Sequence, residues 1–297
     1  MPDTLFIQER TLSSWSLRGH LLMDIAGRSY TPRLIPGGKG FHDRLPPEIA
    51  PATTVPALQL EDGPFVWDTL AIAETLAEMA PDRPLWPADR AARAFARAIT
   101  AEMHSGYGAL RDACSMNITL AFEGFEVSEA VRKDVDRLEE RWAMARARFG
   151  EGGPWLFGAE FTAADAFMAP LATRLLTYGI PVGAVAQAYC AAVVNYGPFR
   201  RWRAMGLAEG PVPTRYDLPL PKAPWPGPAP RPAKALAEGE VPVSAAVNAA
   251  CPYSGKPVAA DSLAEIDGKV IGFCNTFCRD KSVADADAWP KLAPLLA

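Results

Sequence analysis

A proline-rich stretch late in the chain limits the fold more than any other feature of the sequence. Nine of the 22 residues from Pro211 to Pro232 are proline. Proline lacks a backbone N–H and fixes φ, so neither a helix nor a central strand can continue through such a run. We therefore expect an extended, semi-rigid linker over residues 211–246, followed by a separate small module over residues 247–297.

Composition and charge exclude several classes of protein. The 297 residues, 49% of them apolar, are enough for two or more domains. The net charge of −4 argues against binding to nucleic acid or to an anionic membrane, because both require a concentrated basic face on the protein. No apolar run approaches the roughly 18 residues of a membrane span. The N-terminus lacks the layout of a signal peptide. We expect a cytoplasmic protein without a nucleic-acid or membrane partner, its five cysteines being thiols.

The N-terminal part, residues 1–82, has the pattern of a compact α/β unit. TLFIQER and YTPRLIP predict strands, and the proline confines the second of them to an edge. VPALQL and PFVWD around EDG predict a hairpin. Apolar residues at helical spacing predict helices over residues 15–26 and 69–79. The order is therefore strand, helix, strand, loop, hairpin and helix.

From residue 89 to 210 the composition becomes rich in alanine and arginine, and signals for strands nearly vanish. Sustained helical periodicity predicts a helical bundle here. FTAADAFMAP places Thr162 three residues before Asp165, which is a variant of the capping box that starts a helix. Cys114 and Cys190 fit small, buried apolar positions of this bundle.

The motif SSWSLRG places Ser13 and Ser14 at the junction of the first strand and the first helix. A serine in this position commonly serves only as an N-cap. A second reading is chemical, because a hydroxyl donor and the positive end of a helix both favour the thiolate form of a bound thiol, whose ordinary pKa is about 8.5. The three histidines, His20, His42 and His104, have no evident acidic or nucleophilic partner.

Two further motifs are compatible with ligand binding. Val55–Pro56 stands just before a strand, where a cis peptide can expose neighbouring backbone groups. Asp68 and Thr69 open a helix, where a hydroxyl and free N–H groups can hold a carboxylate. Each pair also has a structural reading, since Pro56 can bound the strand and Asp68 or Thr69 can cap the helix.

In this order the motifs resemble those of the cytosolic glutathione transferase family. SSWSLRG is similar to the loop of the serine-type classes, particularly the zeta-like bacterial members, and VWDTLAIAETLAE resembles the family's acid-Ser-Leu-Ala-Ile stretch. FTAADAFMAP resembles the capping box of its second domain. The resemblance covers about residues 1–210. It implies a thioredoxin-like α/β domain, residues 1–82, and an all-α helical bundle, residues 89–210.

The resemblance also implies a function: an enzyme that conjugates the glutathione thiolate to a small electrophile, as in detoxification. Ser13 would stabilise the thiolate, with Ser14 as the second candidate, and the electrophile would bind between the domains near residues 104–114. The residues implied to hold glutathione are Val55 and cis-Pro56 at its cysteinyl part, and Asp68 and Thr69 at its γ-glutamyl end. A two-fold homodimer is implied in the same way.

The chain departs from the family pattern in three respects. Asp68 and Thr69 stand where the family usually has Glu-Ser. Trp15 replaces the cysteine of true zeta enzymes, so maleylacetoacetate isomerisation is not expected, and the absence of a loop cysteine excludes disulfide exchange there. The linker and tail are additions. The alternative function is therefore a non-catalytic protein that kept the scaffold for binding, with the linker and tail contacting a partner.

The tail contains three of the five cysteines, Cys251, Cys274 and Cys278. About 50 residues bury little apolar surface, so such a unit needs a metal or a docking partner. The layout resembles the small YHS and TRASH metal-binding modules, which implies these three thiolates as metal ligands. No histidine remains in the tail to complete the tetrahedron that zinc prefers. We therefore expect less than one zinc ion per chain, and docking without metal stays open.

Overall fold

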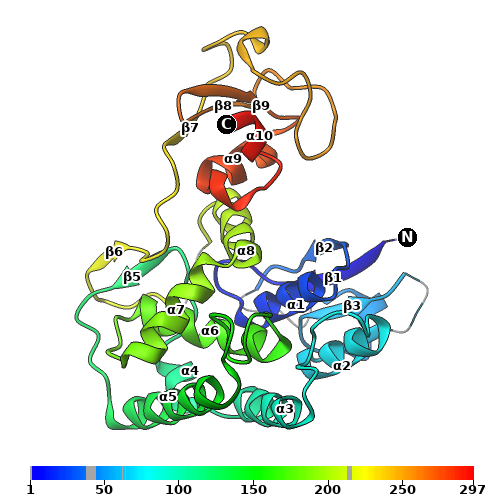
Figure 1. Ribbon diagram of the computed structural model, residues 1–297. Coiled ribbons are helices and arrows are strands. Elements are labelled where there is room, and N and C mark those ends of the chain that lie inside the picture. The colour runs from blue at the N-terminus through cyan, green and yellow to red at the C-terminus, as the bar shows by residue number, and fades with distance from the viewer. Residues whose placement is uncertain (1, 38–44, 62, 64, 213–215) are drawn as a thin grey trace. The chain divides into compact units, whose positions relative to one another are not determined.

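The computed structural model describes residues 2–37, 45–61, 63, 65–212 and 216–297 (Figure 1). The chain forms two compact units. The first comprises Met1–Val194 and Pro213–Pro226, and the second comprises Asn195–Val212 and Gly227–Ala297. The end of the predicted helical region therefore packs with the tail, and part of the predicted linker packs with the first unit.

A four-stranded mixed sheet forms the core of the N-terminal region, in the strand order β2-β1-β3-β4. β1 and β2 are parallel, whereas β3 runs antiparallel to both β1 and β4. The edge position of β2 and the β3–β4 hairpin confirm the predictions for this region. The elements are β1 (Asp3–Ile7), α1 (Ser14–Ile25), β2 (Tyr30–Leu34), the short 3-10 helix η2 (Pro47–Ile49), β3 (Ala57–Gln59), β4 (Phe65–Trp67) and α2 (Thr69–Met79). This is the predicted thioredoxin-like arrangement.

Helices dominate the rest of the first unit. They are α3 (Arg90–Ser105), α4 (Gly108–Ala113), α5 (Glu129–Phe149), α6 (Ala163–Thr177) and α7 (Ala184–Asn195). The central helix is α6, nearly all of whose side chains are buried and which packs against α1 and α3. Its start is the predicted capping box of Thr162 and Asp165. The thioredoxin-like and helical parts thereby share one core, as the fold class requires.

The proline-rich segment is extended but not free of partners. β6 (Lys222–Pro224) pairs antiparallel with β5 (Leu120–Phe122), in a region where the sequence shows no evident strand. A two-stranded ribbon consists of edges only, so it tolerates the proline. Trp225 follows β6, is buried, and donates its indole N–H to Thr177 Oγ1 at 3.0 Å. This contact attaches residues 222–225 to α6.

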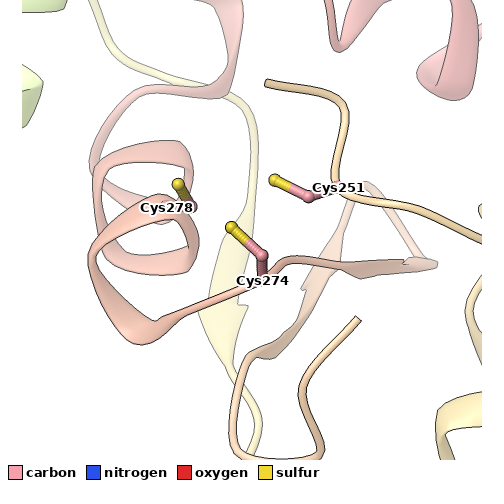
Figure 2. A group of neighbouring side chains, drawn as sticks. All are labelled: Cys251, Cys274 and Cys278. Atoms are coloured by element: carbon pink, nitrogen blue, oxygen red, sulfur yellow. The ribbon is translucent and has the colours of Figure 1, made fainter. Parts of the chain in front are cut away.

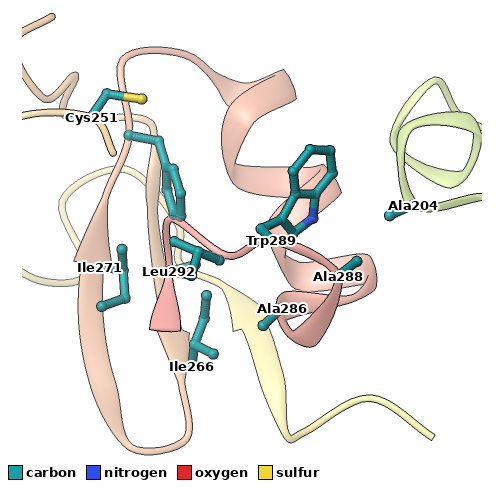
Figure 3. Packing of buried hydrophobic residues seen from close by; sticks show 10 residues of the cluster. Ala204, Cys251, Ile266, Ile271, Ala286, Ala288, Trp289 and Leu292 are labelled. Atoms are coloured by element: carbon teal, nitrogen blue, oxygen red, sulfur yellow. The ribbon is translucent and has the colours of Figure 1, made fainter. Parts of the chain in front are cut away.

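The small core of the second unit contains residues of the tail, 247–297, and of the helix α8, which precedes the linker. A sheet in the order β7-β8-β9 lies with α9, and the apolar cluster around Phe273 and Trp289 extends to Ala204 of α8 (Figure 3). Docking on α8 supplies the burial that the tail lacks alone. The elements are α8 (Gly197–Ala208), β7 (Ala233–Ala235), η3 (Val243–Ala245), β8 (Leu263–Ile266), β9 (Lys269–Gly272), α9 (Thr276–Ala284), η4 (Ala286–Ala288) and α10 (Ala293–Leu296). Among the described helices, none is both long and apolar enough to cross a membrane.

Candidate functional site

Ser13 is the N-cap of α1. Its Oγ accepts the backbone N–H of Ser16 at 3.2 Å and donates to Ser16 Oγ at 2.8 Å. Ser16 Oγ also accepts the backbone N–H of Gln8 at 2.9 Å, which ties the start of α1 to the end of β1. The interpretation of Ser13 as an N-cap is therefore correct. The alternative, that a serine hydroxyl stabilises a bound thiolate, stays open because the same side chain can serve both roles.

Both serines line a cavity of about 540 Å³ in the first unit. The Oγ atom of Ser14, the first residue of α1, accepts a hydrogen bond from Arg174 Nη2 at 3.4 Å. Other walls come from the end of α3, from α4 and from the loop after it. Lining residues include Leu12, Ser105, Arg111, Ser115, Met116 and Tyr216. The helices predicted to face an electrophile, near residues 104–114, do contribute to this cavity.

Two arginines, Arg111 and Arg174, and one aspartate, Asp112, line the cavity, so its walls carry a net positive charge. Arg174 is 5% exposed and donates to the carbonyl oxygens of Cys114 at 2.7 Å and Pro170 at 3.0 Å. Burial, together with the charge of Arg111, lowers the pKa of Arg174 to about 10, so it stays protonated at neutral pH. Arg111 donates to the carbonyl oxygens of His104 and Gly106 at 3.3 and 3.2 Å. Because these partners are neutral, the charge remains available to an anion.

Arg18 of α1 was missed as a site residue by sequence reasoning. It is fully buried, and none of its three guanidinium nitrogens has a hydrogen-bond partner within the described structure. The guanidinium lies 4.0 Å from the centroid of the Trp15 ring and 5.3 Å from that of Phe167. Burial and the charges of Arg174 and Arg111 lower its pKa well below the ordinary value. A signal was present in SSWSLRG, since an arginine on an otherwise apolar helix face must find a partner.

Asp68 and Thr69 form the start of α2. Asp68 has φ 73° and ψ 134°, a strained conformation for a residue with a side chain, and its Oδ1 accepts the N–H of Leu70 at 2.8 Å. Thr69 is fully buried, and its Oγ1 has no partner among the described residues. A strained cap beside an unpaired buried hydroxyl at a helix N-terminus is the type of arrangement that a ligand carboxylate completes.

The expectation that no histidine has an acidic partner was wrong for His104. Its Nε2 lies 3.2 Å from Asp68 Oδ2, and its ring stacks edge-on against Trp15 at 5.2 Å. His104 and Trp15 therefore connect Asp68 to the start of α1, where the serine pair lies. His20 contacts Tyr30 through Nδ1 at 2.8 Å, and His42 lies outside the described residues.

The environment of His104 predicts a pH effect. Burial lowers the pKa of His104 below its ordinary value, Asp68 opposes this shift, and the charges of Arg18 and Arg111 reinforce it. A depressed folded pKa means that stability is fully present above the unfolded pKa and falls as pH drops through the two values. We expect the urea midpoint to decrease between pH 7 and pH 5, and His104→Gln to reduce that decrease. An equal pH dependence in both proteins would contradict this assignment.

Val55 and Pro56 lie beside α1 rather than on the cavity wall. The Val55–Pro56 peptide is cis, as predicted. A Cβ placed on Gly19 of α1 would come within 3.0 Å of Pro56 Cβ, so the proline packs directly on that helix. Neither this pair nor Asp68–Thr69 lines the 540 Å³ cavity. Pro56 nevertheless contacts the helix that begins at Ser14, and α2, which begins at Thr69, packs against that helix.

The tail brings Cys251, Cys274 and Cys278 together in the second unit, and their sulfur atoms all lie within 4.8 Å of one another (Figure 2). Burial raises the pKa of Cys251, but hydrogen bonds from Ser254, from Tyr253 and from Cys274 outweigh it and lower the pKa to about 7. Burial raises that of Cys278 to about 11. Cys114 and Cys190 are buried singly elsewhere, as expected.

Comparison with known proteins identifies the scaffold. The family model for the glutathione S-transferase N-terminal domain matches residues 12–79, and the model for the C-terminal domain matches residues 118–204. Together they span more than half of the chain. The protein belongs to the glutathione transferase family. A search of curated proteins finds no match to the chain.

Solved structures of other glutathione transferases share this fold. A homologue from Burkholderia with bound glutathione is 22% identical, with 70% of this chain and 99% of that one covered at a TM-score of 0.53. A bacterial maleyl pyruvate isomerase of the zeta class is 21% identical, with 67% of this chain and 95% of that one covered at a TM-score of 0.52. Glutathione transferase F2 from Populus trichocarpa is 18% identical, with 70% of this chain and 100% of that one covered at a TM-score of 0.51. At these identities the likeness shows the fold alone.

Proposed function

We propose that this glutathione transferase binds glutathione beside α1 and conjugates its thiolate to a small electrophile. The observation that carries the proposal is the Ser13–Ser14 pair, which stands at the N-terminus of α1 and opens onto a cavity bordered by Arg111 and Arg174. A hydroxyl donor, the helix dipole and nearby positive charge all favour a thiolate over a thiol. The bound glutathione in the Burkholderia homologue supports the same ligand here.

Ser13 is proposed as the hydrogen-bond donor to the sulfur. Its hydroxyl donates to Ser16 Oγ at 2.8 Å. Ser16 carries a hydroxyl proton of its own, so the contact between the two can persist with the roles reversed, which frees the Ser13 proton for the thiolate. Ser14, which accepts from Arg174, is the second candidate. The sulfur then forms a bond to an electrophilic carbon held in the cavity, and with a chloronitrobenzene the carbon–chlorine bond breaks and chloride leaves.

The γ-glutamyl end of glutathione is assigned to the start of α2. The unpaired Thr69 hydroxyl and the first-turn N–H groups other than that of Leu70 suit its carboxylate, and Asp68 suits its ammonium group. Val55, next to cis-Pro56, is assigned to the cysteinyl backbone. A zeta-like subclass, detoxification and a homodimer follow from the resemblance, and a cytoplasmic location follows from the composition; all four stay predictions.

Retention on immobilised glutathione tests the binding site. We expect Thr69→Val to weaken glutathione binding at least tenfold in calorimetry, because it removes a hydrogen bond to a charged group. Thr100→Val is the matched control, since Thr100 in α3 is also fully buried with an unpaired Oγ1 and should bind normally. Equal loss in both variants would contradict the assignment.

Turnover decides between the enzyme and the non-catalytic alternative. Conjugation of a chloronitrobenzene by the full chain supports the transferase. Binding of glutathione without turnover across a set of electrophiles would favour the alternative, in which the scaffold serves interaction only.

A further inference from the structure

The three tail cysteines have the spacing of a ligand set. Cys251 lies directly before the turn at residues 252–254, whereas Cys274 precedes Asn275, the N-cap of α9, and Cys278 lies in the first turn of that helix. Three sulfurs bound to one ion at about 2.3 Å lie about 4 Å apart. The observed separations, all within 4.8 Å, need little movement to reach that arrangement. Figure 2 shows the side chains converging on one space.

Neighbouring donors stabilise negative charge on these sulfurs. The Cys274 sulfur accepts from Ser254 Oγ at 3.2 Å and from Asn275 Nδ2 at 3.4 Å. Outer hydrogen bonds of this kind orient thiolates toward a bound metal ion. They distinguish this group from cysteines that are merely packed together.

The donor set is incomplete for zinc. Within the part of the chain that the structure describes, no histidine or carboxylate joins the three sulfurs. Structural zinc sites are almost always four-coordinate, whereas soft thiolates also select Cu(I). The donor set alone therefore fits a soft ion that accepts three sulfurs.

A cation completes the surroundings of the cluster. Lys281 follows Cys278 by three residues in α9, so it lies on the same side of that helix, and its ammonium lies 3.9 Å from the ring centroid of Tyr253 and 4.2 Å from that of Trp289. Three thiolates around a monovalent ion carry two negative charges, but around a divalent ion they carry one. A fixed positive charge stabilises the first complex more.

We propose that Cys251, Cys274 and Cys278 form a three-coordinate site for a monovalent thiophilic cation, Cu(I), and that Lys281 makes the site prefer it over Zn(II). The proposal specifies the charge and coordination of the ion, which the resemblance to metal-binding modules does not. It is independent of the proposed glutathione conjugation. The ion is bound as Cu(I), so binding involves no electron transfer.

Anaerobic titration of the full chain with Cu(I), against a chromogenic Cu(I) chelator, tests the site. We expect one Cu(I) per chain, three sulfur neighbours in X-ray absorption, and at least 100-fold weaker binding in Cys274→Ser and Cys278→Ser. Cys190→Ala, which removes a buried cysteine of α7, should bind as the wild type does. Circular dichroism of the metal-free variants checks that each one is folded. Weak binding by the folded wild type, or stoichiometric zinc displacing Cu(I), would overturn the proposal.

The role of Lys281 needs a separate comparison. Lys281→Gln should lower the ratio of Cu(I) to Zn(II) affinity about tenfold, because the favoured complex has one more negative charge. Lys281→Arg keeps the charge and should keep the ratio. A merely structural lysine would affect both metals equally, and an unchanged ratio in Lys281→Gln would remove Lys281 from the proposal.

Discussion

Replacing Ser13 with alanine should lower kcat/KM for conjugation of glutathione to a chloronitrobenzene by about 100-fold, the loss typical of one preorganised donor to a reacting anion. The thiolate would then keep the helix dipole and the nearby arginines but lose its hydrogen bond. The spectroscopic pKa of bound glutathione should rise in the same variant. Both effects can be measured in one series of stopped-flow and ultraviolet titrations.

Loss of the N-cap is the main complication, since Ser13→Ala also removes the acceptor for Ser16 N–H. Ser128→Ala provides the matched control, because Ser128 Oγ caps α5 by accepting the Val131 N–H at 3.3 Å. Each variant should lose about 1 kcal/mol of stability, but only Ser13→Ala should lose turnover. Loss of turnover in Ser14→Ala instead would transfer the role to Ser14. Full activity in both serine variants would refute hydroxyl catalysis.

Replacing Asp165 with alanine should reduce the free energy of unfolding by about 3–5 kcal/mol, because several buried donors would each lose their acceptor at a cost of roughly 1 kcal/mol or more. Its carboxylate is fully buried and accepts four hydrogen bonds. The donors are Leu156 N at 3.1 Å, Thr162 N at 2.9 Å, Thr162 Oγ1 at 3.0 Å and Tyr189 OH at 3.1 Å. All four would lose their acceptor in the interior.

Asp89→Ala is the control for this prediction. Asp89 also begins a helix, but its Oδ1 accepts a single hydrogen bond, from Ala92 N at 2.8 Å, at a solvent-exposed position. Its loss should cost only about 1 kcal/mol. Urea unfolding monitored by circular dichroism compares the two variants. Similar losses in both would mean that the buried network around Asp165 contributes no more than a surface cap.

Features encoded within a few residues were predictable. The capping box of Thr162 and Asp165 depends on a spacing of three, and the β3–β4 hairpin depends on a short turn between two alternating runs. The Ser13 cap is equally local. In each case the groups that interact are close along the chain, so composition and periodicity are enough to specify them.

The charged parts of the site could not be predicted in this way. His104 meets Asp68 across 36 positions of the chain, and Arg174 meets Ser14 across 160. Arg18 has no hydrogen-bond partner in the described structure because of which side chains the fold places around it, and the local sequence does not indicate those neighbours. The same holds for the packing of the tail against Ala204, for which the sequence indicated only that some partner was needed.

Hydrophobic period, turn residues and caps act locally, so they were sufficient to indicate an α/β unit followed by a helical bundle, and the resemblance to glutathione transferases implied that the α/β unit is thioredoxin-like. Only the tertiary structure decided which charges surround the Ser13–Ser14 pair and whether the three tail sulfurs converge. Those outcomes depend on side chains that the fold brings together from distant segments, and burial then determines how strongly they interact.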